Sequence, residues 1–479
     1  MSTSLTGIFL GAGASAEIGL PLVWDLTREL QDCLTPDMLR SLNLGWREQG
    51  LGYPDVVIDD MARTLAIPDM HYESILGYLE TQYRRPSRFQ QEYHALYSQL
   101  VELVYYILYF RHTKNVSYIE RHLRYYEGIA HLAELNKPLW IFSLNHDVII
   151  EALAIHCNIP VNCGFSNEIV TLPRRDKNGA KIGELKAETL SGEQLESGGM
   201  PFSQTRTLGI NLLKIHGSLD VFTFRDGKNL LRLLPVEHSV AGLVEALRAA
   251  NNELVYIDPA APDHPAKRTN EIVYADDEGE MQFLRRTLLA GAFKFDSRRR
   301  QVLPPRLLDY FRSSINHISV LICIGYGFGD AHINQVIREW LEFKADRKLE
   351  VVGPGTKYIP PFLLHLAPQI VLRDSTATEY LDLVSGIVRS KRDGLEKRLS
   401  AYMRSNGIKA QTEMQEFFEQ QMDRLTAVCV EKVVALIHEG DIELNSLGMT
   451  PQELTHRWMT ESGGTTDDIL ETFLKSKNA

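Results

Sequence analysis

Short apolar runs without polar alternation recur along the chain, and turn residues bound each of them. A run of this kind predicts a strand that is buried on both faces, as in a parallel sheet covered by helices. The predicted strands are Gly7–Leu10, Leu139–Leu144, Leu212–Ile215, Val320–Ile324, Leu349–Val352 and Gln369–Leu372.

Segments with helical spacing of apolar positions lie between these runs. The predicted helices are Val23–Leu34, Tyr72–Tyr83, Glu92–Arg111, Glu120–Leu135, Val148–His156, Pro305–Ile315 and Ile333–Phe343. Strands that alternate with helices are typical of a doubly wound α/β fold. We therefore expect a mostly parallel, Rossmann-like sheet.

Three segments fall outside this alternation. Residues 50–135 carry long, Tyr-rich helical patterns, more than one crossover needs, and predict a helical insertion. Residues 166–209 are polar and rich in Gly and Ser, which predicts a long surface excursion or lid. No strand pattern follows Gly386, so the sequence predicts one domain over residues 1–385 and a helical module for oligomerisation or partner contact over 386–479.

Composition narrows the class of protein. The 51 basic and 62 acidic side chains give a net charge of -11, which argues against a surface that grips nucleic acid, so no direct sequence-specific nucleic-acid binding is expected. The last 69 residues, 411–479, carry five basic and 13 acidic side chains.

The five cysteines form no CxxC pair and no metal-type spacing with histidine, which predicts no metal and a reducing compartment.

No membrane segment is expected either. The longest near-apolar run, Leu100–Phe110, contains Glu102 and is too short to span a bilayer, and the N-terminus has no signal-peptide pattern. The sequence therefore predicts a cytoplasmic protein.

Two glycine-rich turns directly follow predicted strands. They are Gly11-Ala12-Gly13-Ala14-Ser15 and Gly325-Tyr326-Gly327-Phe328-Gly329. Small residues let backbone N–H groups approach a pyrophosphate, and a following helix directs its positive end at that group. The first turn departs from the GxGxxG fingerprint, because Ala16 stands at the third glycine position. A tight turn that binds no ligand is the alternative.

Polar residues follow two further predicted strands. Asn145 and Asp147 come after one, and His216 comes after another. An Asn amide can both donate to and accept from a ribose hydroxyl and a water, and a His can take a proton. The alternatives are an Asx turn in which Asp147 caps the next helix, and a structural histidine. In the last turn, Asp330 is expected to cap the helix that follows it.

The order of these motifs resembles the sirtuin family. Gly11–Ser15 with Gly19-Leu20-Pro21 is similar to its Gly-Ala-Gly-Ile-Ser…Gly-Ile-Pro cofactor loop, and Asn145 and Asp147 are similar to its Thr-Gln-Asn-Ile-Asp segment. His216-Gly217 matches its catalytic His-Gly, and Gly325-Tyr326 stands where its late turn contacts the cofactor.

Departures from this pattern indicate a particular branch of the family. No cysteine lies between His216 and Cys323, where sirtuin deacylases carry a four-cysteine zinc module, and Leu22-Val23-Trp24 replaces the Phe-Arg that follows Gly-Ile-Pro. The segments Tyr72–Glu80 and Gly325–Asn334 resemble instead the bacterial sirtuin-like NAD hydrolases of antiphage defence systems.

The resemblance implies that NAD is the substrate and that its cleavage gives nicotinamide and ADP-ribose. It implies catalytic roles for Asn145, which holds the ribose and a water, for His216 as general base and for Asp147, which orients its neighbours. The residues expected at the cofactor are Gly11, Ala12, Gly13, Ser15, Asn145, Asp147, Gly325 and Tyr326. Homo-oligomers and a HerA-type ATPase or another defence-system sensor are the implied partners. An NAD-dependent deacylase or ADP-ribosyltransferase, and a non-enzymatic NAD or ADP-ribose sensor, are the alternatives.

Overall fold

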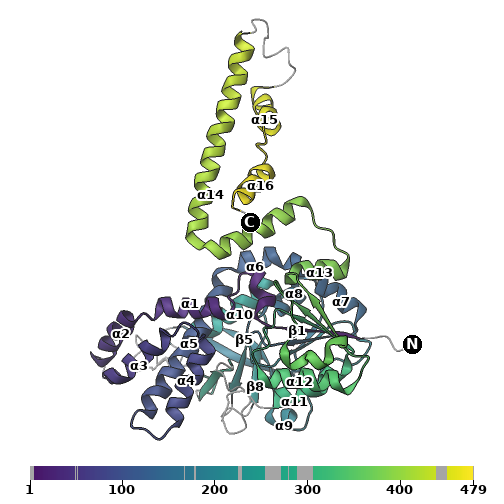
Figure 1. The fold of residues 1–479 in the computed structure, drawn as a ribbon. Helices are drawn as coiled ribbons and strands as arrows, with labels where there is room; N and C mark the ends of the chain where they lie inside the picture. Colours follow the sequence, from purple (N-terminus) through teal and green to yellow (C-terminus); the bar gives the residue numbers. More distant parts are fainter. Residues whose placement is uncertain are drawn as a thin grey trace. The chain divides into compact units, whose positions relative to one another are not determined.

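The computed structural model divides the chain into two compact units, Met1–Gly386 and Ile387–Ala479 (Figure 1). The structure describes residues 5–477 except 49, 51, 167, 177, 179, 225–228, 254–270, 279, 289–305 and 439–449. Pro305, the first residue of one predicted helix, lies outside the described residues. So do parts of the predicted surface excursion and of the predicted C-terminal module.

A seven-stranded sheet forms the centre of the first unit within the described residues, in the order β13-β12-β11-β1-β2-β6-β3. All of its neighbouring strands pair in parallel. Its strands are β1 Thr6–Leu10, β2 Leu139–Ser143, β3 Val161–Asn162, β6 Ile210–Lys214, β11 Val320–Ile324, β12 Lys348–Val352 and β13 Ile370–Arg373. The predicted α/β fold with a mostly parallel, Rossmann-like sheet is therefore confirmed, and only the short edge strand β3 was missed.

Helices cover both faces of this sheet: in Figure 1, α7, α8 and α13 lie on one side of it and α11 and α12 on the other. The α-helices of the first unit, apart from the short α9, are α1 Val23–Cys33, α2 Pro36–Glu48, α3 Asp55–Leu65, α4 Tyr72–Arg84, α5 Gln90–Lys114, α6 Val116–His122, α7 Gly128–Leu135, α8 Ile149–His156, α10 Val240–Glu253, α11 Arg306–Ser314, α12 Ala331–Phe343 and α13 Ala377–Ser385. Helices α1 to α7 all lie between β1 and β2, and of these α3 to α7 fall within residues 50–135, where the sequence predicted a helical insertion.

One predicted helix is wrong. Instead of a single helix over Glu120–Leu135, the chain forms α6, the 3-10 turn η2 Leu123–Tyr126 and α7. A Cβ on Gly128, the first residue of α7, would lie 2.5 Å from the Leu381 carbonyl oxygen of α13. Close packing between two helices therefore decides where α7 begins, and the local apolar spacing does not reveal it.

A second sheet, antiparallel throughout and absent from the sequence prediction, also belongs to the first unit. Its order within the described residues is β4-β5-β8-β7-β10-β9. Its strands are β4 Ile169–Arg175, β5 Lys181–Leu190, β7 Val221–Phe224, β8 Asn229–Leu233, β9 Glu271–Ala275 and β10 Met281–Arg286. The predicted excursion over 166–209 thus contains β4, β5 and the short helix α9 Gly192–Glu196. Exposed positions interrupt the buried ones along β4 and β5, and this kept their apolar runs short.

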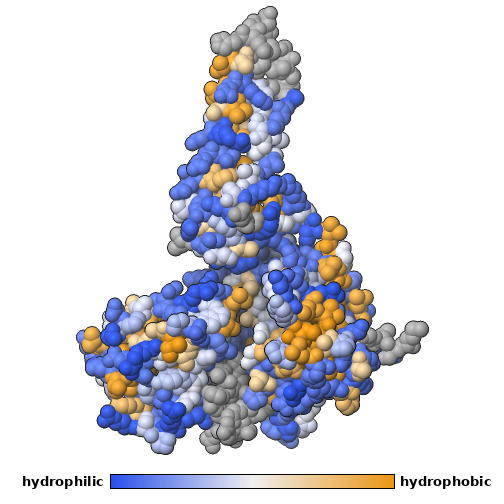
Figure 2. Space-filling model, viewed as in Figure 1, coloured by the Kyte–Doolittle hydropathy of each residue, from blue (hydrophilic) through white to orange (hydrophobic). Residues whose placement is uncertain are grey.

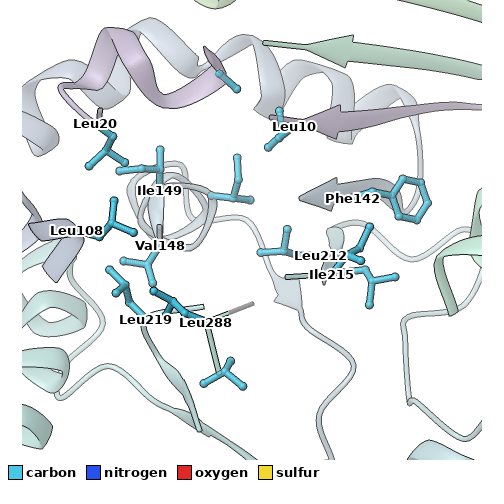
Figure 3. Packing of buried hydrophobic residues seen from close by; sticks show 14 of the residues in the cluster. Leu10, Leu20, Leu108, Phe142, Val148, Ile149, Leu212, Ile215, Leu219 and Leu288 are labelled. Atoms are coloured by element: carbon cyan, nitrogen blue, oxygen red, sulfur yellow. The ribbon is translucent and has the colours of Figure 1, made fainter. Parts of the chain in front are cut away.

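One continuous apolar core joins these parts of the first unit. Figure 3 shows Leu10, Phe142 and Leu212 from the main sheet beside Val148 and Ile149 of the segment that follows β2. Leu108 of the insertion and Leu219 and Leu288 next to the second sheet approach the same cluster (Figure 3). The helical insertion and the second sheet therefore both pack against the same core as the main strands.

The second unit is helical and has a small core. Its helices are α14 Lys391–His438, α15 Pro451–Glu461 and α16 Thr466–Ser476, and Gly407, with φ of 54°, breaks α14. Leu395, Phe473 and Leu474 form its apolar cluster. Apolar side chains also reach the surface of α14 (Figure 2). The exposed ones are Met422, Val430, Val433 and Val434.

Candidate active site at the carboxyl ends of four neighbouring strands

The four motifs follow four strands that are neighbours in the main sheet. The order β11-β1-β2-β6 places the turn at Gly325, the turn at Gly11, the segment at Asn145 and the segment at His216 next to one another. Because these strands are parallel, all four motifs emerge at the same edge of the sheet, where open α/β sheets bind ligands. Segments more than 300 residues apart in the sequence thus form one candidate site.

The two glycine turns pack directly on each other. The Gly13 N–H donates to the Gly325 carbonyl oxygen at 2.9 Å, and a Cβ on Gly11 would lie 2.6 Å from the same oxygen. Gly325 has φ of +64°, and its Cβ would lie 2.3 Å from the Ala14 nitrogen. These glycines are therefore required for backbone-to-backbone contact, whether or not the turns also hold a phosphate.

The element after the first turn differs from the expected α-helix. Ala12–Ile18 forms the seven-residue 3-10 helix η1, which ends at Gly19 with φ of 91°, and α1 begins only at Val23. The Gly11, Gly13 and Ala14 N–H groups already donate to the carbonyl oxygens of Ile324, Gly325 and Gly11, so only the other N–H groups of the turn remain as candidate donors.

A hydrogen-bond network joins the first turn to the segment after β2. Asn145 Nδ2 donates to the Gly11 carbonyl oxygen at 3.0 Å and to Ser15 Oγ at 3.1 Å. Ser15 Oγ donates to Asp147 Oδ2 at 2.7 Å, while Asp147 Oδ1 accepts from the Ile149 N–H at 3.1 Å. Asp147 thus forms the Asx turn of its alternative interpretation, although Val148 is the N-cap residue of α8, and its other carboxylate oxygen fixes Ser15.

This network orients the Asn145 amide. With Nδ2 engaged by Gly11 and Ser15, Oδ1 is the atom left to accept a hydrogen bond, and no described residue donates one to it. Asn145 is buried, with 9% of its surface exposed. A fixed amide oxygen at a strand end can accept from a hydroxyl group or a water molecule of a bound ligand.

His216 lies on the other side of the site, at the end of β6, and is almost completely buried. Its Nε2 lies 3.2 Å from Asp330 Oδ2, and its ring centroid is 6.5 Å from that of His146. Asp330 Oδ1 also accepts from the His332 and Ile333 N–H groups, so its predicted capping of α12 is confirmed. The pair links the motif after β6 to the motif after β11.

The Tyr326 side chain makes its hydrogen bonds within the last turn and the helix that follows it. Its hydroxyl donates to Asn334 Oδ1 at 2.9 Å and accepts from the Asp330 N–H at 3.2 Å, and its ring lies 5.1 Å from that of Phe9. Burial raises the Tyr326 pKa, so the phenol is protonated. Of the predicted pair, Gly325 therefore contacts the first turn directly, whereas the Tyr326 hydroxyl stabilises the last one.

Sequence reasoning gave no role to Lys214, which directly precedes the motif at His216 and contacts the backbone of the segment after β2. Its Nζ donates to the Asp147 carbonyl oxygen and lies 3.5 Å from the Asn145 carbonyl oxygen and from Glu151 Oε1. The Leu219 N–H donates to the His146 carbonyl oxygen at 2.9 Å. The backbone that carries Asn145 and Asp147 is thus fixed by the chain around His216. A lysine inside an apolar strand was the available signal.

Charge compensation explains how a buried lysine persists here. Burial lowers the Lys214 pKa, but the carboxylates of Glu151, Asp147 and Asp220 outweigh that effect, and the net pKa is raised. Burial raises the Glu151 pKa to about 7, although Lys214 opposes this shift. Lys214 is therefore a cation at neutral pH, and its hydrogen bonds to the backbone carbonyls are charge-assisted.

In the part of the chain that the structure describes, no group of three or more His, Cys, Asp or Glu side chains could hold a metal ion. Among the described helices, none combines the length and the apolar character that crossing a bilayer requires.

The fold and this edge define an α/β protein with a Rossmann-like sheet and a buried polar site at the ends of its strands. No family model matches the sequence, and no curated protein matches it. Among solved structures, the chain is similar to a Sir2 homolog crystallised as a complex with NAD, with 13% identity and a TM-score of 0.31 over 80% of this chain and 88% of that one. This likeness is too distant to assign a residue or an activity.

Proposed function

We propose that this protein hydrolyses NAD at the N-glycosidic bond and releases nicotinamide and ADP-ribose. The proposal depends on one observation: the four motifs that resemble those of sirtuins follow four adjacent parallel strands and meet at one edge of the sheet. The chemistry of the residues there suits a nucleotide. An amide and an imidazole can bind ribose hydroxyls, and the turn N–H groups that do not already donate within the protein can bind phosphates.

The departure of the leaving group needs little help from the protein. Nicotinamide is cationic while bonded to ribose and leaves as a neutral molecule, so it requires no acid, and the sugar develops oxocarbenium character. The bond from ribose C1′ to nitrogen breaks, and a bond from C1′ to a water oxygen forms. The protein must therefore position a water molecule and accept a proton from it.

The residues of the site divide these tasks. Asn145 Oδ1 accepts a hydrogen bond from the water or a ribose hydroxyl, and its orientation is fixed by Gly11 and Ser15. His216 accepts the proton as general base. Asp147 holds Ser15 and, through it, the Asn145 amide. We assign the binding of the phosphates to the turns at Gly11–Ser15 and Gly325.

The test is incubation with NAD and analysis of the products, carried out on each assembly state of the purified chain. The parent is expected to release nicotinamide and ADP-ribose, while Asn145→Ala and His216→Ala lose activity by about 100-fold or more. Asn43→Ala is the matched control. Asn43 is also buried and hydrogen-bonded to a backbone, that of Tyr53, but it lies in α2 away from the site.

The outcomes separate the alternatives. A parent rate in His216→Ala would contradict the proposal. NAD loss that requires an acetylated lysine peptide would favour a deacylase, and tight NAD binding without turnover in every assembly state would favour a sensor.

We further propose that this hydrolysis depletes NAD in phage-infected cells, since Tyr72–Glu80 and Gly325–Asn334 resemble segments of antiphage NAD hydrolases. Such an enzyme must stay inactive until it is triggered, and assembly into a homo-oligomer or with a HerA-type ATPase is the proposed means. Cellular NAD should fall after infection in cells that carry the parent and stay constant in cells that carry His216→Ala. Equal NAD levels in the two strains would contradict this role.

A further inference from the structure

Asp330 places one carboxylate oxygen at the helix that it caps and the other at His216. We propose that Asp330 is a positioning residue for the hydrolysis described above: its Oδ2 orients the His216 imidazole and compensates the charge that His216 gains when it takes a proton. The inference rests on the proposed function for its catalytic meaning. The contact itself does not depend on that function.

The Asp330 cap differs from an ordinary helix cap, because only one of its two carboxylate oxygens contacts the helix. Oδ1 alone accepts from both His332 and Ile333, at 3.0 and 3.3 Å, which satisfies the helix start. Oδ2 lies 3.2 Å from His216 Nε2. The Asp330 and His216 side chains are 11% and 3% exposed, so water screens their interaction little.

The turn is built to hold this carboxylate in place. Strand β11 is separated from β6 by β1 and β2, so Asp330 must reach across two strands to meet His216. Phe328 adopts an unusual positive φ of 56°, and Asn334 Nδ2 donates to its carbonyl oxygen at 2.8 Å. The Tyr326 hydroxyl accepts from the Asp330 N–H. Strain and two tethers within one turn are consistent with a functional position.

A carboxylate beside Nε2 has a defined chemical effect. It favours the imidazole tautomer that carries the proton on Nε2, which puts the lone pair on Nδ1, the nitrogen that can then act as base. When Nδ1 takes a proton from the attacking water, the imidazolium is stabilised by the adjacent anion. The proton then passes to solvent, and His216 returns to its neutral form.

The first experiment distinguishes the capping role of Asp330 from the role of its negative charge. The measured quantities are kcat, KM for NAD and Tm. Asp330→Asn and Asp330→Ser keep a side-chain oxygen that can cap α12 but lose the anion. Thr376→Ala is the control, because Thr376 caps α13 with its hydroxyl and loses only a cap. We expect both Asp330 variants to lose tenfold or more in kcat with KM within about twofold, whereas Thr376→Ala lowers Tm and keeps the parent kcat.

A kcat in Asp330→Asn within twofold of the parent would overturn the proposal. Losses in kcat that simply follow the loss in Tm across all three variants would also overturn it.

The second experiment needs no catalytic activity. Tm is measured for His216→Ala, Asp330→Asn and the double variant. If the two side chains interact, the Tm losses of the single variants will not add up in the double variant. Additive losses would overturn the proposed pairing even in an active enzyme. A parent that never consumes NAD, with non-additive Tm losses, would refute the proposed function and leave the pairing intact.

Discussion

The two units of this protein bury apolar surface in opposite ways. The first unit has one continuous core that joins the main sheet, the helical insertion and the second sheet. The second unit has a cluster of Leu395, Phe473 and Leu474 and exposes apolar side chains along α14. A buried polar site needs a rigid surround, which the first unit supplies. An exposed apolar helix face suits contact with another chain, which is the role we expect of the second.

The largest loss of stability in the first unit should come from removing its buried cation, Lys214. Lys214→Met keeps the apolar stem but removes the cation that lowers the Glu151 pKa, so that Glu151 must take up a proton, and it frees the backbone that carries Asn145. We expect a loss of about 3–5 kcal/mol in the free energy of unfolding, measured by denaturant titration. Glu151→Gln added to Lys214→Met should restore part of this loss. Unchanged stability in Lys214→Met would show that the lysine is not needed to hold the segment.

A smaller loss of stability is expected when a glycine is replaced by alanine. The chain offers two glycines that can be compared. Gly325 and Gly386 have similar positive φ values, +64° and +66°, but a Cβ on Gly325 would lie 2.3 Å from the Ala14 nitrogen, while nothing lies within 4 Å of one on Gly386. Gly386→Ala should cost about 1 kcal/mol for its backbone conformation alone. Gly325→Ala should cost about 1–3 kcal/mol more, since the two turns must separate. Equal losses would contradict the close packing of the turns.

The smallest effect on the site should come from removing the second unit. A chain that ends at Gly386 keeps every predicted site residue and the continuous core. We expect the Tm of the first unit to change little, while the molecular mass in solution, measured by light scattering, falls to that of a smaller assembly. An unchanged assembly state after truncation would contradict the proposed role of α14 to α16.

The four motifs of the candidate site could be recognised from the sequence, whereas the residues that surround them could not. The motifs at Gly11, Asn145, His216 and Gly325 lie where apolar runs end, and each could be recognised locally. The pairing of His216 with Asp330 and the lysine that holds Asn145 could not, because they depend on which strands are neighbours. Asp330 was recognised only as a helix cap, which describes one of its two oxygens.

What the sequence determined by itself is six of the seven described strands of the main sheet and the residues that end them. Burial on both faces leaves an uninterrupted apolar run, which is a local property of the chain. Strands β4 and β5 of the antiparallel sheet left no such run, because exposed positions interrupt the buried ones along them. Only the tertiary structure decided the order β11-β1-β2-β6, and with it the meeting of the four motifs. Strand order depends on how crossover helices pack over the whole sheet, and no single segment of the chain encodes it.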